Sequence, residues 1–248
     1  MSLTGLSQVC RLWYTLLMII QGLQKTTLLD YPTKVAATIF FGGCNFRCPF
    51  CHNMDLVLHP EHGLSLSEEE VLSFLRSRQG ILDGVCITGG EPTLQKDLPL
   101  LIEKIKQLGY CVKLDTNGTN PAMLQELTDR ELIDYVAMDI KAAPKDYARV
   151  CNVSNPGLSF VEESIARLLA GKIPYEFRTT IVQEYHDEAG MREIGEWIRG
   201  ADAYFLQSFK DSDFVPDHDL HPCDKETLLR FQEILTPYVQ SVTLRGID

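Results

Sequence analysis

Three cysteines within eight positions of the sequence, Cys44, Cys48 and Cys51, have the clearest potential for chemistry. Three residues separate the first pair and two separate the second, so one loop could wrap three thiolates around a single site. Thiolates bind both zinc and iron–sulfur clusters. A structural zinc site usually takes four protein ligands, often as two separated pairs, and no second pair is visible in this sequence. His52 could be a fourth ligand, although its adjacency to Cys51 makes the geometry awkward.

Two alternatives to zinc remain for this loop. Three ligands on a four-iron cluster would leave one iron open to a substrate or cofactor. The other alternative is a disulfide with one spare thiol. The spacing alone favours a metal site, and the choice of metal depends on the rest of the sequence.

Glycine and glutamate form a second cluster at Gly89, Gly90 and Glu91. Turns commonly use glycine, so the pair of glycines is weak evidence on its own. Glycine also lets the backbone approach a ligand closely, and a glutamate can place negative charge beside an ammonium group. The cluster therefore predicts a tight turn that could face a cationic ligand.

Charged residues mark three further positions. Asp115 opens a segment that includes Asn117. Asp139 precedes Lys141 by two residues, so the side chains of Asp139 and Lys141 lie on the same side of an extended strand. Taken alone, that pair reads as a simple salt bridge. Arg178 lies in the middle of an apolar segment, where an unpaired charge would be costly to bury. We therefore expect Arg178 to face an anionic group.

The elements that must position these residues alternate between short β-branched runs and helical patterns. The expected strands are residues 35–41, 84–88, 111–115, 134–140, 175–182, 203–209 and 241–244. The expected helices are residues 68–78, 96–108, 121–130, 160–169, 189–198 and 224–235. This alternation indicates an α/β fold with a parallel sheet, whose functional residues gather at the carboxyl ends of the strands.

Six such units fit a single-domain partial (β/α)6 barrel, with a doubly wound sheet as the alternative. A complete eight-unit barrel needs about 250 residues. The chain has 248 residues, and its first part does not follow the pattern. We expect residues 18–248 to form this domain and residues 1–17 to be an appendage, with Met18 a plausible alternative start. The apolar run at residues 12–20 is too short for a membrane helix.

At this point the sequence resembles the radical S-adenosylmethionine (SAM) enzymes. The resemblance rests on the cysteine spacing, the aromatic Phe50 before Cys51 and the downstream glycine–glutamate motif. It implies a [4Fe–4S] cluster on Cys44, Cys48 and Cys51, with the open iron chelated by the amino and carboxylate groups of SAM. Reduction of the cluster would cleave SAM to methionine and a 5′-deoxyadenosyl radical.

Within that family, the later motifs are similar to those of glycyl-radical-enzyme activating enzymes. The resemblance implies that Gly89, Gly90 and Glu91 hold the SAM amino group and that Lys141 contacts SAM. Asp115 and Asp139 would help to hold a monovalent cation near the SAM carboxylate. Arg178 would then face that carboxylate or a partner chain. The remaining residues expected to line the cofactor site are Phe50, His52 and Asn117.

One feature separates this chain from the pyruvate formate-lyase activators. Their sixth strand ends in a histidine that contacts SAM, whereas residues 206–209 here contain none. Phe209 could stack on adenine but cannot offer a ring nitrogen. Residues 22–32, together with Cys51, His52 and Asn53, are most similar to anaerobic ribonucleoside-triphosphate reductase activating proteins, and that similarity covers about residues 20–246.

Three functions follow as hypotheses. The first is an activase that generates a glycyl radical on a partner enzyme and takes electrons from a flavodoxin- or ferredoxin-type donor. The second is a radical SAM enzyme for a small molecule, similar to 7-carboxy-7-deazaguanine synthase. The third is a non-catalytic metal or electron-transfer module, for which the extra SAM-binding motifs would be redundant.

The composition of the chain limits the partners and the cellular compartment that we expect. The formal net charge of −11 argues against nucleic-acid binding, and eight cysteines in 248 residues are too sparse for a secreted disulfide scaffold. We therefore expect a reducing cytoplasm and no membrane partner. Cys151 and Cys223 have no cysteine neighbours in the sequence, so a second cluster is not expected. The histidines expected to be solvated are His59, His62, His186, His218 and His221.

Overall fold

The computed structural model describes residues 18–59, 65–171 and 173–247, and these residues form one eight-stranded sheet in the order β1 to β8. β1 pairs antiparallel with β2, and every later neighbour pairs in parallel. β8 does not pair with β1 in this order, so the barrel stays open. The predicted α/β partial barrel is confirmed, while residues 1–17 lie outside the described part. The strands are β1 (Ile20–Thr27), β2 (Ala36–Phe41), β3 (Gly84–Gly89), β4 (Cys111–Thr116), β5 (Tyr135–Asp139), β6 (Tyr175–Ile181), β7 (Tyr204–Ser208) and β8 (Val242–Arg245).

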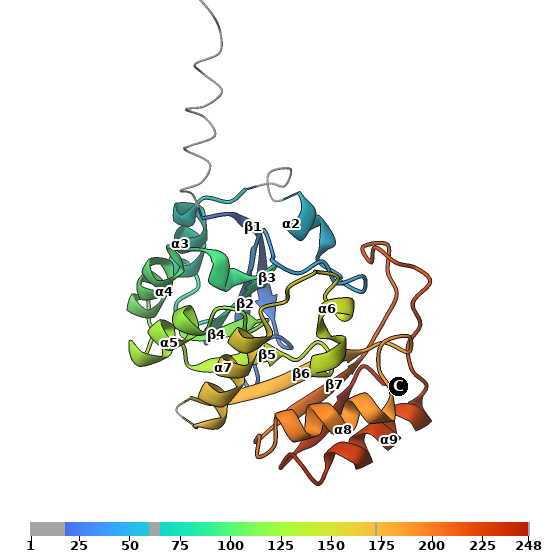
Figure 1. Ribbon diagram of the computed structural model, residues 1–248. Helices are drawn as coiled ribbons and strands as arrows, with labels where there is room; N and C mark the ends of the chain where they lie inside the picture. The colour runs from blue at the N-terminus through green and yellow to red at the C-terminus, as the bar shows by residue number, and fades with distance from the viewer. Residues whose placement is uncertain (1–17, 60–64, 172, 248) are drawn as a thin grey trace, which may run out of the picture.

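Helices follow the parallel strands and lie on the outside of the sheet (Figure 1). Several begin where the sequence places a capping side chain: Ser67 forms a capping box with Glu70, and the side chain of Asp224 accepts a hydrogen bond from Thr227 N. Each cap satisfies a backbone N–H that has no partner inside its helix. The helices are α2 (Met54–Leu58), α3 (Glu68–Arg76), α4 (Leu98–Gln107), α5 (Pro121–Asp129), α6 (Tyr147–Val150), α7 (Leu158–Leu169), α8 (Glu188–Trp197) and α9 (Lys225–Leu235), with short 3-10 turns η1 (Pro92–Leu94) and η2 (Pro144–Asp146).

The first strand was not predicted. β1 contains glycine, glutamine and lysine between its buried ends, so it shows neither the continuous apolar run nor the strict alternation typical of a strand. Pairing with β2 creates it, with Ile20 opposite Phe41 and two irregularities in the register. Short α2 and α6 were also missed, because a single helical turn carries no periodic signal.

Strand alternation divides the sheet into an apolar face and a polar face. Val112 and Leu114 of β4 belong to the buried apolar core. The alternate residues of the same strand, Lys113 and Asp115, line a cavity together with charged residues of β6. The parallel register continues this arrangement, since Asp139 of β5 lies opposite Arg178 of β6. The polar face of the sheet therefore leads along the strands to their carboxyl ends.

Candidate active site

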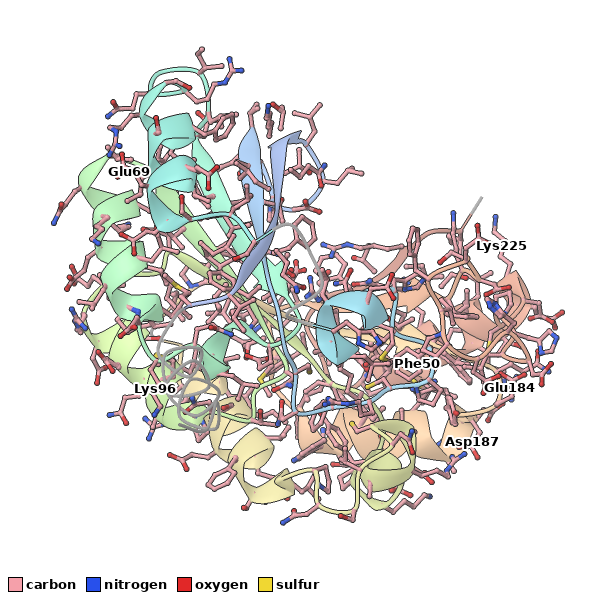
Figure 2. The ribbon with its side chains drawn as sticks, turned by 90° about the horizontal axis from the view of Figure 1, so that it is seen from above. Phe50, Glu69, Lys96, Glu184, Asp187 and Lys225 are labelled. Carbon is pink, nitrogen blue, oxygen red and sulfur yellow. The ribbon has the colours of Figure 1, made fainter. Side chains whose placement is uncertain are left out.

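One cavity of about 260 Å³ lies at the carboxyl ends of the parallel strands. All thirteen residues predicted for the site line it: Cys44, Cys48, Phe50, Cys51, His52, Gly89, Gly90, Glu91, Asp115, Asn117, Asp139, Lys141 and Arg178. In the view from above, Phe50 lies inside the curve of the helices, whereas Glu69, Glu184 and Asp187 lie at the rim (Figure 2). The strand-end argument thus located these residues together, and their chemical roles remain predictions.

The cysteine loop follows β2 and is held by hydrogen bonds from side chains and from its own backbone. The Arg47 guanidinium donates to the carbonyl oxygens of Cys44 at 2.5 Å and Phe46 at 2.7 Å. Phe46 N donates to Cys44 Sγ at 3.4 Å, and Asn117 Nδ2 reaches the same sulfur at 3.9 Å. Backbone and amide donors of this kind stabilise a thiolate ligand.

The thiols of the loop are free, as are all seven cysteines in the described part of the chain. Burial, together with the charge of Glu91, raises the pKa of the Cys44 thiol to about 12. A metal would therefore displace protons when it binds there. Among the described residues, no group of three or more His, Cys, Asp or Glu side chains is placed to hold a single metal ion.

The glycine turn after β3 packs against the beginning of the cysteine loop. Gly90 N donates to Phe41 O at 2.8 Å, and Glu91 N donates to Gly43 O at 2.8 Å. A Cβ added to Gly90 would lie 2.0 Å from Gly43 O, a backbone atom that cannot move aside. Gly89 has a φ of 117°, and a Cβ added there would lie 2.3 Å from Phe41 N and 2.4 Å from Phe41 O. The close approach of two backbones therefore requires both glycines.

Glu91 is almost fully buried and accepts several hydrogen bonds. One carboxylate oxygen accepts from Thr93 N at 3.1 Å and Thr116 Oγ1 at 2.8 Å, and the other accepts from Asn117 N at 2.7 Å. Burial raises the pKa of Glu91, and these hydrogen bonds oppose the rise by favouring the ionised form. The result is a fixed carboxyl group facing the cavity beside the cysteine loop.

A partly buried ion-pair network joins β4, β5 and β6. Arg178 Nε donates to Asp139 Oδ1 at 2.6 Å, and its Nη2 lies 3.2 Å from Asp115 Oδ2. Lys141 Nζ contacts Asp139 Oδ2 at 2.8 Å, and Lys113 pairs with Asp115. Arg178 thus contacts two carboxylates of its own chain, and the role expected for it toward SAM or a partner chain stays a prediction.

Burial alone would raise the pKa of Asp139, but the positive charges of Arg178 and Lys141 outweigh it and hold that pKa well below its usual range. The same pairing raises the pKa of Lys141, against its burial. All three groups are therefore charged at neutral pH. They form a fixed electrostatic wall opposite the cysteine loop.

His186 and Cys151 belong to the surroundings of this site, and the sequence reasoning missed both. The expectation that His186 is solvated is wrong: its side chain is buried, Nδ1 accepts from Val182 N at 3.0 Å, and Nε2 contacts Lys141 O at 3.0 Å. His186 thus supports the backbone of Lys141. Cys151 lies against the cysteine loop, since Arg47 N donates to its carbonyl oxygen at 2.9 Å. Both contacts join segments far apart in the sequence, so no local pattern signals them.

His52 is held to the end of β7. Its Nε2 lies 2.7 Å from Lys210 O, and its ring centroid is 5.9 Å from that of Phe209. Phe209 is buried. His62 lies outside the described residues.

Within residues 18–59, 65–171 and 173–247, no helix is both long enough and apolar enough to cross a membrane.

Comparisons with known proteins identify the family. Residues 38–197 match the model of the Radical SAM superfamily. A protein of Methanocaldococcus jannaschii with the provisional name glycyl-radical enzyme activating enzyme is 34% identical over 240 residues, 93% of this chain and 97% of that protein.

Two further matches cover parts of the chain. The 7-carboxy-7-deazaguanine synthase of Neisseria meningitidis is 37% identical over 107 residues, 43% of this chain and 44% of that enzyme. The crystal structure of a domain of pyruvate-formate lyase-activating enzyme from Bacteroides vulgatus has a TM-score of 0.54 at 21% identity, covering 66% of this chain and 99% of that domain. The last likeness supports the fold alone. With more than half of its length matched by the family model, the chain belongs to the Radical SAM superfamily.

Proposed function

We propose that this protein is an activase that generates a glycyl radical on a partner enzyme. The observation that carries the proposal is the meeting of a three-cysteine loop, a glycine turn and a partly buried ion-pair network around one cavity. The choice of an activase over other radical SAM chemistry is supported by the activating-enzyme relative, which matches nearly the whole chain.

The cysteine loop fits a [4Fe–4S] cluster. Cys44, Cys48 and Cys51 are free thiols that line the cavity, and N–H groups already point at the sulfur of Cys44. Three thiolates would hold three irons of the cluster and leave the fourth for SAM. When bound, the reduced cluster and SAM supply a 5′-deoxyadenosyl radical that takes a hydrogen atom from the substrate.

The charged residues that line the same cavity fit SAM. Glu91 offers a carboxylate for the SAM ammonium, while Lys141 and Arg178 offer positive charge for its carboxylate. Both cations are already fixed by Asp139, so they need no large rearrangement to receive the ligand. The chain's own contribution is thus to orient SAM against the cysteine loop.

A monovalent cation beside Asp115 and Asp139 stays a prediction. Both carboxylates already contact Arg178, so a cation would share them with the guanidinium. SAM-binding titrations in potassium chloride and in tetramethylammonium chloride test this, because only the potassium ion fits such a site. The flavodoxin- or ferredoxin-type donor is likewise a prediction.

The open side of the sheet offers a route for a protein substrate. A second cavity of about 200 Å³ shares Asp115, Arg178 and Gln207 with the first and extends to Leu29. Leu28 and Leu29 are 72% and 92% exposed at this end. A glycine-bearing loop of the partner could therefore enter along the polar face of the sheet and bring its backbone to SAM.

The experiment follows a deuterium atom. Reduced protein is mixed with SAM and a short peptide that copies the glycine loop of a candidate glycyl-radical enzyme, with the glycine α-carbon deuterated. Deuterium in the 5′-deoxyadenosine product supports the activase. The partial match to 7-carboxy-7-deazaguanine synthase supports a small-molecule alternative. If glycine loops never donate deuterium while a small metabolite donates its hydrogen, that alternative replaces the activase.

A further inference from the structure

The backbone of Lys141 lies just beyond the end of β5. Ile140 N still donates to Arg178 O of β6 at 2.9 Å. The next residue is held by side chains instead: Lys141 N donates to Tyr147 Oη at 3.3 Å, and Lys141 O lies 3.0 Å from His186 Nε2. Two side chains therefore hold the backbone of Lys141 from both sides.

His186 makes its contact from a buried position outside the cavity. The residue is 6% exposed and does not line the site cavity. It lies in the turn between β6 and α8, where its Nδ1 is 3.0 Å from Val182 N and 3.1 Å from Val182 O. The ring thus joins the end of β6 to the segment that follows β5.

The surrounding groups determine which ring nitrogen of His186 carries the proton. Lys141 O can only accept, so an unprotonated Nε2 would place two acceptors 3.0 Å apart. Nε2 therefore carries the proton and donates it. Val182 O already accepts from the backbone N–H groups of Tyr185 and His186. Burial lowers the pKa of His186, which keeps the ring neutral and leaves Nδ1 as the acceptor for Val182 N.

Lys141 is consequently held at both ends. Its Nζ contacts Asp139 Oδ2 at 2.8 Å, and its backbone is held by Tyr147 and His186. A lysine ammonium stands on a flexible four-carbon stem, and ordering such a side chain on a ligand costs free energy. A lysine that is already held needs less ordering when it receives an anionic group.

We propose that His186 is a positioning residue for SAM binding, because its Nε2–H holds the Lys141 carbonyl and so keeps the Lys141 ammonium in place for the SAM carboxylate. This role rests on the function proposed above, in which Lys141 faces SAM. It belongs to a residue that lies outside the cavity and acts through Lys141.

Two substitutions separate the two hydrogen bonds of the ring. The amide nitrogen of His186→Gln can take the place of Nε2 and donate to Lys141 O, whereas the shorter side chain of His186→Asn reaches only the position of Nδ1, near Val182. Each protein is reconstituted without oxygen, and iron per chain, the SAM dissociation constant and the denaturant midpoint are measured. Tyr110→Phe is the control, because it removes a buried hydrogen bond to a backbone carbonyl, that of Leu75 at 2.7 Å, away from the cavity.

We expect His186→Asn to keep its iron and to raise the SAM dissociation constant about fivefold, the effect of losing one hydrogen bond. His186→Gln should bind SAM as the unaltered protein does, and Tyr110→Phe should lose stability without losing SAM affinity. Because His186 acts through Lys141, the asparagine substitution should have no further effect on SAM binding in the Lys141→Ala chain.

An unchanged SAM dissociation constant in His186→Asn overturns this role, and so does a glutamine variant that binds SAM as weakly as the asparagine variant. An effect that persists in the Lys141→Ala chain also overturns it, because His186 would then act elsewhere. Loss of iron from His186→Asn would show that the ring supports the fold rather than Lys141. If the unaltered protein takes up no iron or binds no SAM, the proposed cofactor site itself fails, and the role of His186 fails with it.

Discussion

The two walls of the site cavity are held together by different kinds of contact. On the side of β2 and β3, the cysteine loop and the glycine turn are joined backbone to backbone, and Gly90 lies where even a methyl group would meet Gly43 O at 2.0 Å. On the side of β4, β5 and β6, side-chain charges hold the structure, with Arg178 joined to Asp115 and Asp139. The first wall is a rigid frame for ligands, and the second is an electrostatic surface for a charged small molecule.

Because of this difference, we expect substitutions in the two walls to impair different properties of the protein. Damage to the backbone wall should cost the cluster or the fold itself. Damage to the charged wall should cost SAM affinity while the cluster stays, because those residues lie outside the cysteine loop. Substitutions in each wall therefore test whether cluster binding and SAM binding separate in this way.

The largest expected effect is the loss of the cluster. Replacing Cys44, Cys48 or Cys51 by alanine leaves two thiolates for a cluster that needs three. We expect most of the iron and all SAM cleavage to disappear, measured as iron per chain and as 5′-deoxyadenosine formed. Cys111→Ala should keep both, and a cysteine-loop variant with full iron would contradict the assignment.

The next effect concerns the backbone wall. Gly90→Ala places a Cβ against a carbonyl oxygen, so we expect the free energy of unfolding to fall by about 3 kcal/mol, the upper end of the usual range for overpacking. Denaturant titration of the cluster-free chain measures it. Gly22→Ala is the matched control, because its nearest new contact, at 3.4 Å, is a side-chain atom of Phe40. Equal effects in the two variants would count against a required close approach.

The charged wall should show a smaller, more specific effect. Ala replacements of Asp139 or Lys141 in the charged wall, and of Glu91 next to the glycine turn, are expected to raise the SAM dissociation constant about tenfold or more, about 1.4 kcal/mol each, with iron retained. Equilibrium binding of SAM to the reconstituted protein measures this. Lys145→Ala, which removes an exposed lysine paired with Glu193, is the control. Normal SAM binding in the three variants would leave these residues as structural ion pairs.

The smallest effect is on stability as a function of pH. Burial opposes ionisation of Asp139, but Arg178 and Lys141 lower its pKa in the folded chain. Its carboxylate therefore stabilises the fold above the unfolded-state pKa of about 3.9, and that stability is lost as pH falls through the lower folded-state pKa. Unfolding titrations at several pH values should show Asp139→Asn least stable relative to the unaltered chain near neutral pH. The gap should narrow below about pH 4. A gap that stays constant in acid would mean that the charge of Asp139 contributes nothing.

Much of this arrangement was predictable from sequence because strand ends are local features. Apolar runs that end in glycine or acidic residues located β3, β4 and β5 within one or two residues, and parallel topology then brought Glu91, Asp115 and Asp139 to one edge. The two-residue spacing of Asp139 and Lys141 correctly placed them side by side, as their 2.8 Å contact shows.

The missed features depend on contacts between distant segments. β1 becomes a strand only when β2 is beside it, and its own sequence has no strand period. His186 follows β6 in a polar stretch, and only the fold shows that its ring lies beneath Lys141. Cys151 reaches the cysteine loop because its carbonyl oxygen, at the end of α6, accepts a hydrogen bond from Arg47 N. Such contacts leave no trace in local spacing.

The central claim is that the backbone wall holds a [4Fe–4S] cluster and the charged wall presents SAM to it. The most direct measurement is the electron paramagnetic resonance spectrum of the reduced, anaerobically reconstituted protein, recorded before and after SAM is added. We expect about four irons per chain and a cluster signal that SAM changes in the unaltered protein but not, at the same SAM concentration, in Lys141→Ala. Stoichiometric zinc in place of iron, or a cluster signal that SAM leaves unchanged, would contradict the claim.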